Sequence, residues 1–249
     1  TSELINLLKL QLVIGDGVSS YEAGEVWHLL DTRIEMPLSK IRLNQFSRIS
    51  LDKYTTLVMV SGSYNQLNEK DLKKISDWVK KGNTLITIAR GSSWVINKKI
   101  IKETLLEPKK DSVFSRKRYV DARENIGKER IGGAIISVDL DLTHPLAFGY
   151  RDFSIPVYKN NNVFVNKTKD HYSSVGIYSD NLHIDGYISE KNKRDHFDDT
   201  ASLIVSRLGS GRVVIFADNP NFRGSWFGTN KLFLNAIFFG NNISVPTNN

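Results

Sequence analysis

Short runs of apolar residues alternate with amphipathic stretches along the first part of the chain. Residues 8–15 (LKLQLVIG) and 56–60 (TLVMV) are almost continuously apolar, which is typical of strands buried on both faces of a sheet. Residues 21–32 repeat apolar positions at helical spacing. A weaker strand pattern follows at 36–43, so the chain opens with the order strand, helix, strand.

The segment from residue 55 to residue 94 predicts a strand–helix–strand unit. After the strand at 56–60, Asn68 can cap a helix, and acidic residues follow in its first turn, where the helix dipole favours anions. Gly82 supplies a left-handed stop, and residues 84–89 (TLITIA) form the next strand. Such a short unit predicts a right-handed parallel crossover.

The middle of the chain is less regular than its two ends. Residues 107–170 hold one convincing strand, at 134–140, and we expect an insertion or an elaborated edge there rather than a second domain. Residues 202–208 and 212–216 read as two strands joined by a tight Gly-Ser-Gly connection. A last helix is predicted at 226–239.

These elements predict a single domain over residues 1–243, followed by a tail at 244–249. The fold class is α/β: a three-layer sandwich with a mostly parallel central sheet, flavodoxin-like, with helices on both faces. In open parallel sheets, ligands bind beyond the carboxyl ends of the strands. Candidate functional residues are therefore expected in the segments that follow the predicted strands, which are 16–20, 61–64, 89–93 and 217–223.

Composition excludes some functions without naming one. The 249 residues are 40% hydrophobic and 24% charged, which are ordinary values for a globular protein. No apolar run approaches the roughly 18–20 residues that cross a bilayer, so we expect no membrane span. The chain has no cysteine, which removes disulfides, thiolate metal ligands and thiol nucleophiles.

The net charge of +7 raises the question of nucleic acid. Most of the excess lies between Lys109 and Arg130, but acidic residues interrupt that stretch, and no recognition helix, RNA-binding signature or zinc finger accompanies it. Charges of mixed sign suit a protein interface better than a phosphate backbone. We therefore expect no nucleic-acid partner.

Metal sites need clustered ligands, and the histidines of this chain are scattered. They are His28, His144, His171, His183 and His196. The carboxylate pairs Asp139/Asp141 and Asp198/Asp199 are better explained as solvated or turn-forming residues. The Gly15-Asp16-Gly17 segment is too short to indicate a dinucleotide site. No metal site is predicted.

Residues 82–93 (GNTLITIARGSS) form a strand, a sharp turn and a helix start, and they resemble the nucleophile elbow of class I glutamine amidotransferases. That family has a cysteine followed two residues later by glycine. Here Gly91 matches the glycine, and Ala89 stands at the nucleophile position. The resemblance places the base histidine just after a late strand, where this chain has Ala217 and Asp218. Both halves of the nucleophile–base pair are absent.

Polar residues at the strand ends remain candidates for binding rather than catalysis. The candidate ligand-binding residues are Arg90, Ser92, Asp218 and Arg223. Aromatic residues near them can line a pocket or seal the interface between sheet and helices, and these are Tyr64, Trp94, Trp226 and Phe227. Ser92 and Ser93 are better explained as helix-starting residues than as substitute nucleophiles.

Three longer stretches, at residues 19–41, 118–152 and 209–240, resemble the C-terminal amidotransferase-like domain of bacterial zinc carboxypeptidase-like proteins of the Bacteroidetes type. In that family, a separate metallopeptidase domain carries the zinc site on a His-x-x-Glu pair, and this chain has no such pair. The resemblance implies an accessory domain without a cofactor of its own, with zinc only in the missing peptidase domain. It also implies export from the cytoplasm.

Two function classes follow. The first is a non-catalytic interaction domain that serves an attached or neighbouring peptidase domain, with the basic stretch facing that domain. The second is a degenerate amidotransferase fold that binds a small ligand, such as a peptide or a cell-wall fragment, at the strand ends. An open strand-end crevice favours binding, and a crevice filled by Trp94 or Trp226 favours scaffolding.

Overall fold

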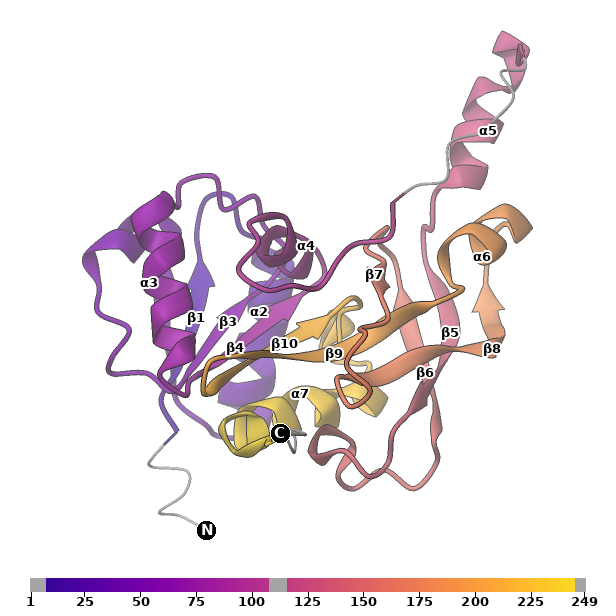
Figure 1. Ribbon diagram of the computed structural model, residues 1–249. Coiled ribbons are helices and arrows are strands. Elements are labelled where there is room, and N and C mark those ends of the chain that lie inside the picture. The colour runs from indigo at the N-terminus through magenta and orange to yellow at the C-terminus, as the bar shows by residue number, and fades with distance from the viewer. Residues whose placement is uncertain (1–7, 108–115, 245–249) are drawn as a thin grey trace.

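The computed structural model describes residues 8–107 and 116–244, which form a three-layer α/β sandwich around one mixed sheet. The sheet has ten strands in the order β2-β1-β3-β4-β10-β9-β8-β5-β6, and β7 pairs with β9 off this path. Figure 1 shows the sheet running through the middle of the molecule, with helices on either side.

Five strands form the parallel part of the sheet, and they confirm the predicted fold class. They are β1 (Leu10–Ile14), β2 (Leu38–Arg42), β3 (Thr56–Met59), β4 (Thr84–Ile88) and β10 (Gly211–Phe216). Each pairs in parallel with its neighbours in the order β2-β1-β3-β4-β10. Because β3, β4 and β10 are buried on both faces, their sequences are almost continuously apolar.

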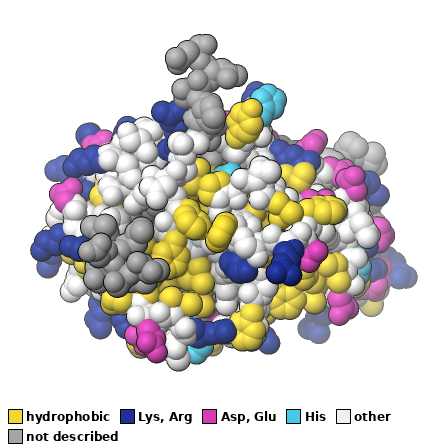
Figure 2. Space-filling view, turned by 90° about the horizontal axis from the view of Figure 1, so that it is seen from below, with side chains coloured by type: hydrophobic (Ala, Val, Ile, Leu, Met, Phe, Trp, Pro, Cys, Tyr) yellow, Lys and Arg dark blue, Asp and Glu magenta, His cyan; other side chains and the backbone are white. Residues whose placement is uncertain are grey.

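Two pairs of helices cover the two faces of this part. Helices α2 (Ser20–His28) and α7 (Phe227–Phe239) pack on one face, while α3 (Glu69–Lys80) and α4 (Arg90–Asn97) pack on the other. Strand residues alternate between the two cores, so Leu12 packs with the α2 and α7 side and Val13 with the α3 side. Seen from below, hydrophobic side chains also reach the surface among basic ones (Figure 2).

Local signals in the sequence set the boundaries of these helices. Asn68 caps α3 as predicted, and Asp71 completes a capping box with it. Gly82 follows α3 with φ of +114°, the left-handed conformation that glycine adopts without strain. Helix α2 continues into a π-helical turn at Leu29–Arg33. Short 3₁₀ turns lie at Leu43–Arg48, Tyr119–Asp121, Pro145–Ala147, Phe222–Gly224 and Gly240–Asn242.

The other half of the sheet is antiparallel, and it contains more strands than the sequence pattern predicted. Its strands are β5 (Ala134–Leu140), β6 (Ser154–Lys159), β7 (Val165–Asn166), β8 (Ser174–Gly186) and β9 (Thr200–Leu208). The expectation of a single strand in 107–170 was wrong, because β6 and β7 lie there too. Strand β6 alternates buried and partly exposed residues around Pro156, a weaker signal than a continuous apolar run.

Two further helices belong to this half. Helix α6 (Glu190–His196) joins β8 to β9, and α5 (Ala122–Glu129) precedes β5. Figure 1 shows α5 standing away from the rest of the molecule. In the described part of the chain, no helix is both long and apolar enough to cross a membrane.

Candidate functional site

The turn between β4 and α4 has the backbone shape of a nucleophile elbow. Ala89 has φ of 49° and ψ of −114°, outside the regions that alanine ordinarily occupies. Its N–H donates to the carbonyl of Phe216 at 2.8 Å, and the N–H groups of Ser92 and Ser93 donate to its own carbonyl. Such backbone strain persists only where the surrounding structure enforces it. In this chain the side chain at the strained position is the methyl group of Ala89.

Gly91 is required by close packing at this turn. A Cβ at this position would lie 2.5 Å from the carbonyl oxygen of Met59 and 2.6 Å from that of Val60. Contacts this short with backbone atoms cannot be relieved by moving a side chain. The match between Gly91 and the glycine of the amidotransferase elbow therefore has a steric cause: helix α4 begins against the end of β3.

The backbone N–H that follows a nucleophile often stabilises the oxyanion of a reaction intermediate. In this chain that group is the N–H of Arg90, and it donates to Oγ of Ser61 at 3.2 Å. The N–H of Ser61 in turn donates to Oε2 of Glu22 at 2.8 Å. The donor that would serve catalysis is therefore used to join the loops after β3 and β4.

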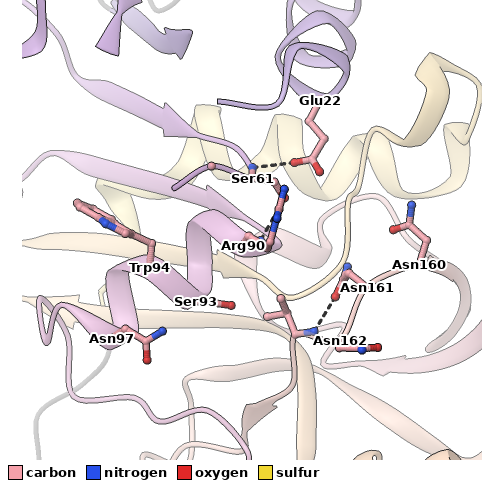
Figure 3. A pocket seen from close by; sticks show the side chains of 11 residues that line it. Glu22, Ser61, Arg90, Ser93, Trp94, Asn97, Asn160, Asn161 and Asn162 are labelled. Carbon is pink, nitrogen blue, oxygen red and sulfur yellow. Dashed lines mark hydrogen bonds between the residues drawn. The ribbon is translucent and has the colours of Figure 1, made fainter. Parts of the chain in front are cut away.

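An open cleft of about 670 Å³ lies beside the elbow. It is lined by Glu22, Ser61, Gly62, Arg90, Ser93, Trp94, Asn97, Asn160, Asn161, Asn162 and Val163. In Figure 3 the three consecutive asparagines lie on the opposite side of the cleft from Trp94 and Asn97, and Arg90 extends between them toward Glu22. The walls thus come from α2, from the loop after β3, from α4 and from the loop between β6 and β7.

Two carboxyl groups of α2 hold the neighbouring loops in place. Glu22 accepts from the N–H of Ser61, while Glu25 accepts from the N–H of Arg223 at 2.6 Å and from Nδ2 of Asn219 at 2.5 Å. Burial raises the pKa of both carboxyl groups, and the hydrogen bonds oppose this shift only in part. Both carboxyl groups are half-buried, and the negative charge of Glu22 also raises the pKa of Glu25.

The position expected for a base is occupied by a structural network. Ala217 and Asp218 are both buried, and the carboxylate of Asp218 accepts from Nζ of Lys159 at 2.8 Å. It also accepts from the hydroxyls of Tyr178 and Ser202, each at 2.7 Å. Burial lowers the pKa of Lys159, an effect that the charge of Asp218 opposes, and burial raises the pKa of Tyr178. All the oxygens of this carboxylate are thus engaged beneath the surface.

The four predicted ligand-binding residues do not meet in one site. Arg90 lines the cleft, but Ser92 is fully buried, with its Oγ 2.9 Å from both Oγ1 of Thr87 and the carbonyl oxygen of Phe216. Asp218 lies in the buried network, and Arg223 lies on the loop after β10, with its guanidinium over the ring of Phe222. Ser92 and Asp218 are therefore held by neighbours and do not line the cleft.

Several cleft residues were missed by the sequence analysis. Asn160, Asn161 and Asn162 read only as a turn, and Glu22 and Asn97 read as ordinary helix residues. A run of three asparagines is itself a signal, because amide side chains in a loop supply donors and acceptors together. Nothing in the sequence indicated that this loop packs beside the elbow.

The four aromatic residues divide into two pairs. Tyr64 is fully buried, packs at 5.2 Å between ring centroids against Trp94, and donates its hydroxyl to the carbonyl of Val60. Trp226 and Phe227 lie at the start of α7, with the indole N–H of Trp226 donating to the carbonyl of Pro156. Tyr64 and Trp94 thus seal α4 against the sheet, and Trp94 leaves the cleft open while forming part of its wall.

The histidines make local contacts and do not converge. Nδ1 of His144 accepts from the N–H of Leu146, His183 pairs with the carbonyl of Gly186, and His196 stacks on Phe164. Among the described residues, no group of three or more His, Asp or Glu side chains could hold a metal ion. Of the described residues that line the cleft, none is a histidine.

No family model and no curated protein matches this sequence. Solved structures match its fold. A chain of PurLQS from Thermotoga maritima has a TM-score of 0.61 and 16% identity over 93% of this chain and 98% of that one. A ThuA-like protein from Parabacteroides merdae ATCC 43184 has a TM-score of 0.60 and 12% identity over 96% and 93%. A ThuA-like protein from Bacteroides uniformis ATCC 8492 has a TM-score of 0.56 and 11% identity over 92% and 89%.

These likenesses place the chain in the α/β fold of class I glutamine amidotransferases and ThuA-like proteins. At such low identity, they show the fold alone. The predicted amidotransferase-like architecture is therefore confirmed.

Proposed function

We propose that this chain is a non-catalytic domain that binds a small polar ligand in the cleft beside Ala89. The observation that carries this proposal is the combination of a strained elbow with no nucleophile and an open cleft beside it. The N–H of Arg90 and the carboxylate of Asp218, which lie where catalytic groups would stand, are both engaged by neighbouring side chains. The role proposed for the cleft is therefore to bind a ligand.

The chemistry of the walls favours a ligand with a carboxylate and several amide or hydroxyl groups. Arg90 is exposed, and no hydrogen bond to a described residue engages its guanidinium, so its donors are available to a carboxylate. Asn97, Asn160 and Asn162 offer paired donors and acceptors, whereas the amide of Asn161 is engaged by Lys159, Val163 and Ala217. Glu22 is the one acidic side chain among the described residues that line the cleft, and burial raises the pKa of its carboxyl group. A peptide, or a peptide-bearing cell-wall fragment, carries this set of groups.

The resemblance to zinc carboxypeptidase-like proteins suggests where such binding would be used. An accessory domain that binds the C-terminal carboxylate of a peptide would keep that peptide close to a neighbouring peptidase domain. A carboxypeptidase domain acts on the same end of the peptide. This context, the zinc in that separate domain and export from the cytoplasm all rest on the sequence resemblance.

Isothermal titration with trialanine and with its C-terminal amide tests the proposal. We expect the free carboxylate to bind about tenfold more tightly or better, because an Arg–carboxylate hydrogen bond contributes roughly 1.5–3 kcal/mol. Arg90→Gln should remove the preference, whereas Arg223→Gln should retain it, since Arg223 lies outside the cleft. Equal affinity for the two peptides, or the same loss in both variants, would contradict the proposal.

A further inference from the structure

A segment that we call the arm, residues 116–130, projects from the antiparallel half of the molecule (Figure 1). It contains the 3₁₀ turn Tyr119–Asp121 and helix α5, and neither has a buried residue. An isolated helix of this length is only marginally stable in water, because nucleation is unfavourable and few hydrogen bonds follow it. A stable arm therefore needs a surface to pack against.

The exposed face of the arm combines apolar and basic side chains. Tyr119, in the 3₁₀ turn, is 96% exposed, and Ile126, in α5, is 54% exposed. Arg123 lies in α5 and Arg130 directly follows its last residue, and both are exposed. Large apolar groups that project this far into solvent are characteristic of an interface.

The acidic residues of the arm are neutralised within the arm. Asp121 pairs with Arg118, Glu124 with Lys128 and Glu129 with Lys117. Arg116, Arg123 and Arg130 have no ion pair with a described residue. With six basic and three acidic side chains, the arm has a net charge of +3.

A polar hollow of opposite charge lies close to the base of the arm. An open hollow of about 870 Å³ between β8 and α6 is lined by four acidic side chains, Asp180, Glu190, Asp198 and Asp199, and by three basic ones, Lys167, Lys193 and Arg194, so its lining has a net charge of −1. Leu182 and Phe197 form its apolar part. Glu190 and Asp199 pair with Lys193 and Lys167. Asp180 and Asp198, both exposed, have no ion pair with a described residue.

We propose that the arm docks in this hollow of a second copy of the chain, so that two copies exchange arms about a two-fold axis. Three arginines of the arm, Arg116, Arg123 and Arg130, have no ion pair with a described residue, and their charge is opposite to that of Asp180 and Asp198 in the hollow. Within one chain, no ion pair of the described residues joins arm and hollow. The hydrogen bond from Nδ2 of Asn192 to the carbonyl of Lys128 fixes only the base of the arm beside the hollow.

A second copy is favoured over an unrelated partner because the complementary surface is present on this chain. In a two-fold pair each arm would meet the other copy's hollow, so the contact closes and does not build a filament. Tyr119 and Ile126 would then lie near Leu182 and Phe197. This inference is independent of the ligand proposed for the cleft.

Charge reversal tests the proposal by sedimentation equilibrium of the whole chain at low and high salt. We expect a dimer that weakens with salt, and a dissociation constant raised about tenfold or more in Arg123→Glu/Arg130→Glu and in Asp180→Lys/Asp198→Lys, because like charges then face each other. An equimolar mixture of the two variants should dimerise again, since each reversed arm meets a reversed hollow.

The control is Arg48→Glu/Lys53→Glu, which makes the same change in net charge at exposed residues of the parallel half. It should dimerise like the unaltered chain. Circular dichroism of all variants checks that they fold. A monomer at every concentration, a dimer that neither reversal weakens, or a mixture that stays monomeric would overturn the proposal.

Discussion

Nζ of Lys159 lies 2.8 Å from Oδ1 of Asp218, and both side chains are almost completely buried. The same ammonium donates to the carbonyl of Val163 at 2.9 Å and to Oδ1 of Asn161 at 3.2 Å. The ion pair thus joins the end of β10 to the loop between β6 and β7, which carries Asn160, Asn161 and Asn162. It lies at the position where the amidotransferase resemblance places the base histidine. One wall of the cleft is therefore held in place by a buried ion pair.

We predict that Lys159→Met destabilises the protein by about 3–5 kcal/mol, because it leaves the carboxylate of Asp218 buried without its cation. Chemical denaturation measures this effect. Lys73→Met removes the exposed ion pair with Asp77 and should leave the midpoint almost unchanged. Similar midpoints for the two variants would show that the buried pair has no special role.

The elbow and the first helices could be predicted because their signals are local. Asn68, Gly82 and Gly91 each act on their own turn, and the sharp bend at Ala89 follows from a strand running directly into a helix. Each of these signals depends on only a few neighbouring residues in the sequence.

The cleft could not be predicted because its walls depend on distant contacts. Lys159 and Asp218 are 59 residues apart, and a lysine at the end of a strand gives no sign that it will be buried. For the same reason, Ser92 and Asp218 seemed available to a ligand. Their position after strands was correct, but hydrogen bonds from other strands and loops enclose them.

We predict that Ala89→Gly stabilises the protein by about 1 kcal/mol. Backbone strain at a non-glycine residue costs on the order of 1–3 kcal/mol, and the added freedom of glycine in the unfolded chain offsets roughly 0.5–1 kcal/mol of the relief. Ala236→Gly in α7 is the matched control and should destabilise, because Ala236 is a buried helix residue without positive φ. Urea denaturation of both variants decides the matter: equal losses of stability would mean that Ala89 is not strained.

The carboxyl groups of Glu22 and Glu25 predict a specific dependence of stability on pH. Burial raises the pKa of both above the ordinary value of 4.5, so between that value and the raised pKa the folded protein retains protons that the unfolded chain releases. Their contribution to stability is fully present below pH 4.5 and is lost as the pH rises through the raised pKa. We expect the free energy of unfolding of the unaltered chain, relative to Glu22→Gln/Glu25→Gln, to fall as the pH is raised from 4 to 7. Urea denaturation at steps across this range measures it.

Glu190→Gln is the control, because the hydrogen bond from Lys193 lowers the pKa of Glu190 and gives a dependence of the opposite sign. A difference between the chain and the double variant that stays constant or rises with pH would contradict the prediction.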